Sequence, residues 1–271
     1  MTYFGFLLRF LVIPILILLF ITWREKDRPT PGFRKSLIWT GILVHVILAV
    51  IYTTPWDNYL VATGVWYYNP DLVTGIVLGY VPIEEYTFFV LETILAGLWW
   101  WFLARRIPEP SSPLPENGAK LRTVAVSALL VIWLASVYLF FWGADSWNYL
   151  SITLMWALPA ILPQFIFGAD LLWHYRKLVF LTIFVPGTYL SLMDIVALTD
   201  TTWSISPGQT TGVLFFGILP LEEVVFFFIT NVLIGFGLTL MLSQTGQERA
   251  RAWKAKFFPG DNSKHVNTEA V

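Results

Sequence analysis

Long apolar stretches alternate with short polar ones along most of the chain. A helix of roughly 20 apolar residues can cross a hydrocarbon core of about 30 Å. Seven runs approach or exceed that length, at residues 3–23, 36–52, 72–102, 124–142, 149–167, 178–198 and 211–242. We therefore expect an all-α integral membrane protein with seven transmembrane helices.

The third and seventh runs are too long for one straight crossing. As a continuous helix, residues 72–102 would span roughly 46 Å. Each of the two runs contains a proline, Pro82 or Pro220, and proline removes a backbone donor and clashes with the preceding helical turn. We expect both helices to be tilted or broken, with the break at the proline.

Composition agrees with a membrane protein and excludes several other classes. Of the 271 residues, 56% are hydrophobic and 13% are charged, whereas soluble domains carry about 25% charged residues. The absence of cysteine excludes disulfide scaffolds, iron–sulfur clusters, thiolate zinc sites and a cysteine nucleophile. The net charge of −1 offers no basic field for nucleic acid.

The positions of the basic residues predict the orientation in the membrane. Apart from Arg9, all Lys and Arg residues lie at 24–35, 105–122, 176–177 and 249–264. The connections at 53–71, 143–148 and 199–210 contain none. The positive-inside rule then places the N-terminus outside and the C-terminus in the cytoplasm of a multi-pass cell-membrane protein. The first run lacks a basic n-region, so we expect it to stay in the mature protein.

One motif occurs twice in the chain. Asp57, Trp66 and Pro82-Ile83-Glu84-Glu85 recur as Asp194, Trp203 and Pro220-Leu221-Glu222-Glu223. The offset is 137 residues for Asp and Trp and 138 for the Pro-x-Glu-Glu part. An aromatic run follows each Glu-Glu pair. Such self-similarity indicates an internal repeat.

The repeat predicts how the chain is divided. We expect a three-helix repeat at 1–104, a cytoplasmic linker plus helix 4 at 105–148, a second three-helix repeat at 149–243 and a cytoplasmic tail at 244–271. Both repeats would start outside, so they are parallel and related by a pseudo-twofold axis along the membrane normal, with helix 4 as the joining crossing. The polar, basic tail is expected to form a helix near the inner leaflet.

Glutamates inside the apolar runs are the candidate catalytic groups. An ionised side chain there costs about 2.5 to 3.5 kcal/mol, yet the runs contain Glu84, Glu85, Glu92, Glu222 and Glu223. The alternative is that they only form hydrogen bonds between helices. Neighbouring helical residues point in different directions, so we expect one carboxyl of each pair to face a cavity and the other a polar support. A neutral acid beside a carboxylate in a dry site can protonate and deprotonate an apolar substrate, so buried glutamates of this kind are candidates for acid–base chemistry.

Other residues are candidates for substrate binding or support. They are Asp57, Trp66, Asp194, Trp203, Glu92, Asn231 and Arg9. Arg9 either holds one glutamate ionised or extends to the outer interface, and the sequence leaves both open. The 14 Trp, 22 Phe and 11 Tyr residues suggest carbocation chemistry, because aromatic faces attract cations, although most would serve as interface belt and packing.

Several cofactor classes lack the residues they need. No lysine lies in a span, which excludes a retinal Schiff base. No G-x-G-x-x-G or P-loop motif occurs, nor a pair of aspartate-rich motifs that would hold a diphosphate through magnesium. We expect neither a cofactor nor a metal.

The doubled Asp…Trp…Pro-x-Glu-Glu unit in a small cysteine-free membrane protein resembles the lycopene cyclase domain family. That family occurs as heterodimers in actinobacteria, fused in archaea, and joined to phytoene synthase in fungi. The resemblance covers roughly residues 3–242. It implies a linear carotenoid substrate such as lycopene, non-redox cyclisation of ψ end groups to β-ionone rings, and catalytic roles for the four Pro-x-Glu-Glu glutamates.

Other functions are also compatible with the sequence. Parallel repeats, broken helices and buried carboxylates also occur in proton-coupled transporters. A related cyclase could form ε or γ rings or act on longer carotenoids. The repeat permits either one composite site or one site per half, and the differences at Arg9, Glu92 and Asn231 favour the composite site.

Overall fold

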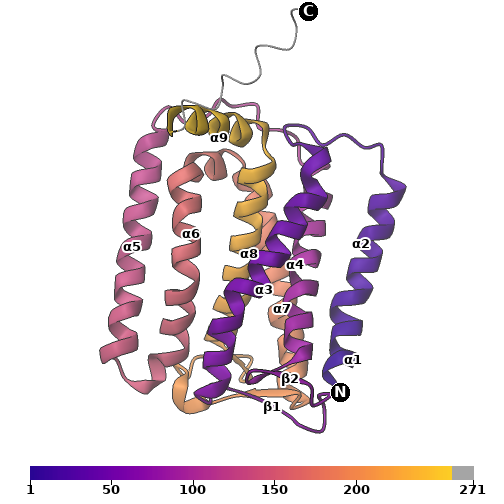
Figure 1. The fold of residues 1–271 in the computed structure, drawn as a ribbon, viewed down its shortest axis with the longest axis vertical. Helices are drawn as coiled ribbons and strands as arrows, with labels where there is room; N and C mark the ends of the chain where they lie inside the picture. Colours follow the sequence, from indigo (N-terminus) through magenta and orange to yellow (C-terminus); the bar gives the residue numbers. More distant parts are fainter. Residues whose placement is uncertain (258–271) are drawn as a thin grey trace, which may run out of the picture.

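The structure, a computed structural model, describes residues 1–257. Seven of the helices in this part of the chain are long and apolar enough to cross a membrane, as the hydropathy pattern predicted, and they form one bundle (Figure 1). The helices are α1 (Tyr3–Leu7), which continues through a π-helical turn (Leu8–Val12) into α2 (Ile13–Arg24), α3 (Ile38–Ala62), α4 (Ile83–Ala104), α5 (Gly118–Trp142), α6 (Asn148–His174), α7 (Arg176–Thr199), α8 (Leu221–Leu242) and α9 (Gln244–Phe257).

Helices α4 and α8 lie at the centre of the bundle. Helix α4 packs against α2, α3, α7 and α8, and α8 also packs against α3, α6 and α7. About two thirds (67%) of the apolar window of α4 and half (50%) of that of α8 is buried, against 11% for α5. The two helices that begin with Glu-Glu are therefore those best shielded from lipid.

The third and seventh apolar runs do break at their prolines. Helix α4 begins directly after Pro82 and α8 directly after Pro220. The residues before them are not helical but form two small hairpins, β2 (Val77–Leu78) with β3 (Val81–Pro82) and β5 (Leu214–Phe215) with β6 (Leu219–Pro220). The second hairpin has one residue more in its turn, where Phe216 adopts a φ of +53°, and this accounts for the change of offset from 137 to 138.

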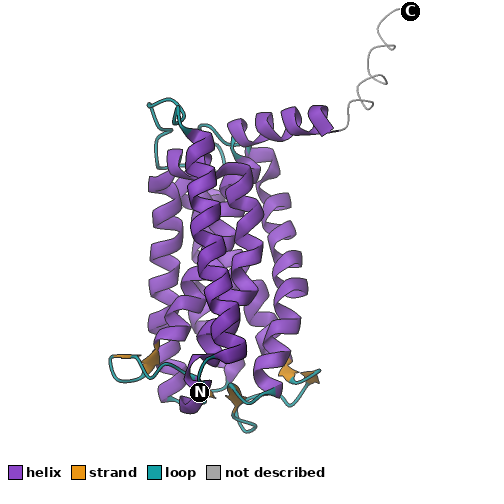
Figure 2. Ribbon diagram, turned by 90° about the vertical axis from the view of Figure 1, so that its left-hand side faces the viewer, coloured by secondary structure: helices purple, strands orange, loops and turns teal. Residues whose placement is uncertain are grey.

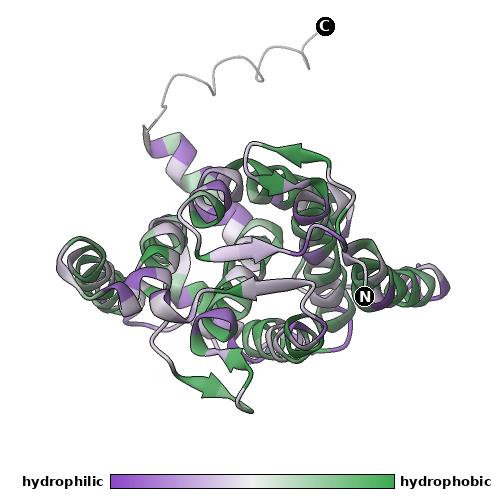
Figure 3. Ribbon diagram, turned by 90° about the horizontal axis from the view of Figure 1, so that it is seen from below, coloured by the Kyte–Doolittle hydropathy of each residue, from purple (hydrophilic) through white to green (hydrophobic). Residues whose placement is uncertain are grey.

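A third strand pair joins distant parts of the chain. Strand β1 (Trp66–Tyr68) follows α3, and β4 (Trp203–Ile205) follows α7; they pair antiparallel, with Tyr68 opposite Trp203. Seen from below, this ribbon crosses the middle of the bundle between the two hairpins (Figure 3). It closes the lower end of the bundle, where the N-terminus also lies (Figure 2).

The first and fifth spans also correspond, but with a one-residue difference that coincides with a π-helical turn in the first. Tyr3 and Tyr149 are 146 residues apart, whereas Pro14 and Pro159 are 145 apart. The π-helical turn at Leu8–Val12 accommodates one extra residue. Two equivalent hydrogen bonds support the correspondence of the halves. The Tyr52 hydroxyl donates to the Trp156 carbonyl, and the Tyr189 hydroxyl donates to the Phe10 carbonyl. Tyr189 is 137 residues after Tyr52, and Trp156 is 146 residues after Phe10.

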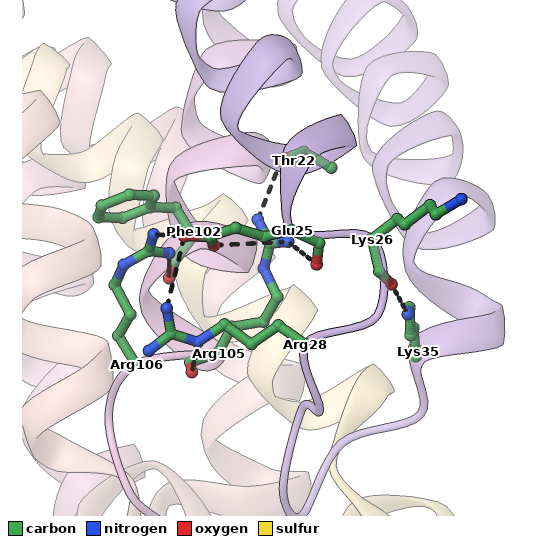
Figure 4. Close-up of polar contacts among 8 residues, drawn as sticks. All are labelled: Thr22, Glu25, Lys26, Arg28, Lys35, Phe102, Arg105 and Arg106. Carbon is green, nitrogen blue, oxygen red and sulfur yellow. Dashed lines mark hydrogen bonds and ion pairs between the residues drawn. The ribbon is translucent and has the colours of Figure 1, made fainter.

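Arginines hold the helices together at the upper end (Figure 4). The buried Arg105 guanidinium donates to the Thr22 hydroxyl at 3.1 Å and to the Glu25 carbonyl at 3.2 Å. Arg106 pairs with the Glu25 carboxylate at 2.5 Å, and Arg28 donates to the Arg105 carbonyl at 3.0 Å. The end of α2 is therefore fixed to the end of α4.

The tail folds back on the bundle. Arg249 of α9 forms two bonds of 2.7 Å with the Asp170 carboxylate of α6, which Arg122 also contacts at 2.9 Å. Helix α9 consequently lies across the upper end (Figures 1 and 2), and the expected helix after Gln244 is present. The rest of the predicted tail, residues 258–271, lies outside the described residues.

Candidate active site

A pocket lies between α4 and α8 near the lower end of the bundle. Its lining combines acidic and aromatic side chains from both halves of the chain: Tyr3, Trp66, Tyr68, Glu85, Phe88, Asp194, Trp203, Glu223, Phe226 and Phe227. Two of the four predicted catalytic glutamates, Glu85 and Glu223, are in this set. Both are buried, with 5% and 3% of their surface exposed.

Glu85 is held by tyrosines. The hydroxyl of Tyr3, at the start of α1, donates a hydrogen bond to its carboxyl. Tyr68 of β1 lies beside it, and burial, with the Glu85 charge as the next cause, holds the pKa of Tyr68 well above its usual value.

Glu223 has closely similar surroundings. The hydroxyl of Tyr149, at the start of α6, donates to its Oε1 at 2.6 Å, and Nε1 of Trp66 donates to the same oxygen at 3.3 Å. Trp66 belongs to β1, so strand pairing carries a residue from the first half onto the glutamate of the second. Likewise, Trp203 of β4, in the second half, packs on Tyr3 of the first half, with ring centres 4.8 Å apart.

The first glutamate of each pair supports the backbone instead. Oε1 of Glu84 accepts from the Thr74 amide at 2.6 Å, and Oε1 of Glu222 from the Thr211 amide at 2.7 Å. Both lie in the first turn of a helix, where a carboxylate also interacts favourably with the helix dipole. One carboxyl of each pair thus lines the pocket and the other bonds a loop amide, so Glu84 and Glu222, expected to be catalytic, do not line the pocket.

Replacing Glu84 by alanine is expected to destabilise the hairpin before α4. The Thr74 amide loses its acceptor, at a cost of about 1 kcal/mol, so the melting temperature of the solubilised protein should fall. Glu84→Gln keeps a side-chain oxygen as acceptor and is expected to recover much of the loss. Equal destabilisation by both variants would contradict this supporting role.

The two predicted aspartates lie next to the pocket but differ from each other. Asp194 lines it and accepts a bond of 2.8 Å from Nε1 of Trp203. Asp57 is fully buried, and neither of its oxygens accepts a hydrogen bond within the described residues.

Three other predicted support residues are not brought to the pocket. Glu92 lies two turns along α4, where the Thr230 hydroxyl donates to it at 2.7 Å. Asn231 donates to the Phe227 carbonyl of its own helix at 2.8 Å. Arg9 is exposed and contacts the Met1 sulfur at 3.2 Å. Within residues 1–257 Arg9 forms no ion pair with a glutamate and lies at the surface instead.

Sequence reasoning missed the tyrosines. Tyr3 and Tyr149 each begin a span at matched positions, which is the signal that could have found them. Phe88, Phe226 and Phe227 belong to the aromatic runs noted after each Glu-Glu pair. Among residues 1–257, no group of three His, Cys, Asp or Glu side chains has the geometry of a metal site.

The arrangement is suited to proton transfer on an apolar molecule. Three carboxyl groups, those of Glu85, Asp194 and Glu223, line the same pocket, and hydroxyl and indole donors fix their orientation. Aromatic faces of Trp66, Trp203 and Phe226 surround the space between them, and such faces stabilise a transient cation.

Comparison with known proteins finds relatives whose names all include lycopene cyclase or lycopene beta-cyclase. The lycopene cyclase family model matches residues 1–103 and 145–241. Lycopene beta-cyclase from Halobacterium salinarum is 38% identical over 200 residues, covering 74% of this chain and 81% of the relative. Bifunctional lycopene cyclase/phytoene synthases from Podospora anserina and Aspergillus oryzae are 33% and 31% identical, and the match covers 34% and 35% of their length.

No solved structure matches this chain. The matched residues include both Pro-x-Glu-Glu motifs, both strands of the β1–β4 ribbon and both tyrosines at the starts of α1 and α6. This multi-pass membrane protein therefore belongs to the lycopene cyclase family.

Proposed function

We propose that this protein is a lycopene β-cyclase that closes the linear ψ end groups of lycopene to β-ionone rings. The reaction adds and removes one proton and leaves the molecular formula unchanged, so the enzyme is an isomerase. The observation that carries the proposal is the shared pocket of Glu85 and Glu223, buried among aromatic rings. The 38% identity to an archaeal lycopene beta-cyclase supports the same substrate.

In the proposed mechanism one glutamate is the acid and the other the base. The acid protonates the terminal double bond and leaves a tertiary cation, and an inner double bond attacks that cation to form the ring carbon–carbon bond. The charge moves to a ring carbon, and the base removes the neighbouring proton to form the ring double bond. The aromatic lining stabilises both cations and excludes water that would trap them as alcohols.

The pairing of strand β1 from the first half with β4 from the second supports one composite site rather than one site per half. Trp66 of the first half binds Glu223 of the second, while the Trp203 ring packs on Tyr3. The two parallel three-helix repeats, 1–104 and 149–243, would then meet at the pocket, with α5 as the extra crossing. The matched bonds of Tyr52 and Tyr189 support this division.

The two glutamates are similar enough to exchange roles. After one ring closure the acid has lost its proton and the base has gained one. Because Glu85 and Glu223 each have a tyrosine partner at the start of a matched helix, the newly protonated glutamate can protonate the second end group. The other then acts as base, and both return to their starting states.

The basic segments support an orientation with the pocket near the outer face of the cell membrane. All connections at the lower end of the bundle lack Lys and Arg, so the N-terminus would be outside and α9 cytoplasmic. Lycopene dissolves in the bilayer and needs no aqueous route to the pocket.

Expression of this chain alone in a lycopene-accumulating bacterium tests the proposed function. We expect bicyclic β-carotene as the main pigment, identified by chromatography. A Glu85→Gln, Glu223→Gln double variant present in equal amount in the membrane serves as the control and should leave lycopene unchanged. Unchanged lycopene with the parent protein would refute the proposal, and ε or γ rings would correct the position of proton removal.

A further inference from the structure

A lateral groove of about 310 Å³ lies beside the carboxylate pocket, between α3, α4, α6 and α8. Its rim is on the lipid-facing surface, where Leu48 and Tyr52 are 56% and 41% exposed. The groove contains small residues that leave space, including Ala49 and Ala160. Its floor includes Glu92, whose carboxyl is already bonded to Thr230.

A row of stacked aromatic rings runs from the rim of this groove to the pocket. Tyr52 stacks on Trp156 at 5.8 Å, Trp156 on Trp56 at 4.5 Å, and Trp56 on Phe226 at 5.3 Å. Phe226 lines both the groove and the carboxylate pocket. Its ring also lies 5.9 Å edge-on from Trp66, which donates to Glu223. Groove and pocket are thus adjacent parts of one aromatic surface.

We propose that this groove binds the polyene chain of lycopene and directs the ψ end group to the carboxylate pocket, whose free volume of about 20 Å³ must widen to admit it. The inference rests on the proposed function and names where the rest of that substrate lies. A flat conjugated chain can pack along the stacked rings at van der Waals distance. From Phe226 to Leu233 the groove follows α8 for about 10 Å, and the remaining chain extends through the open rim into the bilayer.

The groove and the pocket suit chemically different parts of the substrate. The pocket carries the carboxyl groups that transfer protons, and the groove carries a predominantly apolar wall with one occupied carboxyl. Under this proposal Glu92 contacts the chain rather than the reacting end. The predicted support residue therefore belongs to substrate binding and not to the acid–base pair.

A second lateral cavity provides a matched control. About 270 Å³ lies between α2, α4 and α7, lined by Pro14, Ile17, Leu18, Leu95, Trp99, Val185, Pro186 and Tyr189. Val185 and Pro186 are 137 residues after Leu48 and Ala49 of the first groove. However, no lining residue of this cavity also lines the carboxylate pocket. The cavity therefore has the same place in the other half but lacks the connection.

Filling each cavity in turn tests the proposal. The measurement uses a Glu85→Gln background, which is expected to bind lycopene with little conversion. The lycopene retained by the purified protein is measured from its absorbance. Ala160→Phe places a ring in the groove and is expected to reduce retention at least tenfold, whereas Val185→Phe in the second cavity should leave it unchanged. Unchanged retention with Ala160→Phe, or equal loss with both variants, would overturn the proposal.

Single cysteines give a second measurement that does not depend on tolerance of a large side chain. The native chain contains no cysteine, so Ala160→Cys and Val185→Cys each introduce a unique thiol. Lycopene should slow alkylation by N-ethylmaleimide at position 160 several-fold and not at 185. Protection at neither position would overturn the groove assignment, while failure of the parent protein to cyclise lycopene would refute the proposed function separately.

Discussion

Glu85→Gln and Glu223→Gln are each expected to reduce lycopene cyclisation at least about 100-fold, the usual contribution of a general acid or base. Glutamine has nearly the same shape and can still accept the hydrogen bond from Tyr3 or Tyr149 that glutamate accepts. It can neither give nor take a proton at the substrate. Because the pocket draws one glutamate from each half, loss of either should stop both ring closures. The measurement is product formed per folded protein in membranes or nanodiscs.

The adjacent glutamates provide the matched controls. Glu84→Gln and Glu222→Gln remove the same charge one residue away, but these side chains bond to loop amides rather than line the pocket. We expect them to keep most of the activity per folded molecule. If they lost activity as fully as Glu85→Gln, the supporting role would be wrong. If one of Glu85→Gln and Glu223→Gln stayed fully active, the composite site would be wrong.

The helices and the break points could be predicted from the sequence because they depend on local properties. Apolar length predicts a membrane span, and proline at positions 82 and 220 prevents continuation of a helix towards the N-terminus. The different directions of Glu84 and Glu85 follow from helical geometry alone. Even the one-residue change of offset was visible, although its cause, the longer turn containing Phe216, was not.

The partners of each glutamate could not be predicted from local pattern. Tyr3 and Glu85 are 82 residues apart, and Trp66 and Glu223 are 157 apart, so their contacts depend on how the helices pack and on the β1–β4 pairing. Arg9 illustrates the same limit. As a basic residue inside an apolar run it suggested either a counter-ion or a side chain that extends to the outer interface, and in the structure it is exposed.

Cyclisation in D₂O tests whether the two glutamates exchange roles without exchanging their protons with solvent between the two closures. Each closure transfers one proton from the acid to the substrate and one from the substrate to the base. If the same base then acts as acid for the second end group, the second ring receives a hydrogen that came from the first. Exchange with solvent is hindered because Glu85 and Glu223 are 5% and 3% exposed and the β1–β4 ribbon crosses this end of the bundle.

We therefore expect bicyclic product made in D₂O from unlabelled lycopene to contain fewer than two deuterium atoms per molecule, as measured by mass spectrometry. A reference sample in which monocyclic product is supplied as substrate starts from a solvent-equilibrated enzyme and should gain more deuterium in the ring it closes. Two deuterium atoms in nearly every bicyclic molecule would mean that the carboxyl groups exchange protons with solvent between the two closures. Direct transfer of a hydrogen from the first ring to the second would then be refuted, whereas the acid–base pair itself would stand, because the closure of each ring would still require both glutamates.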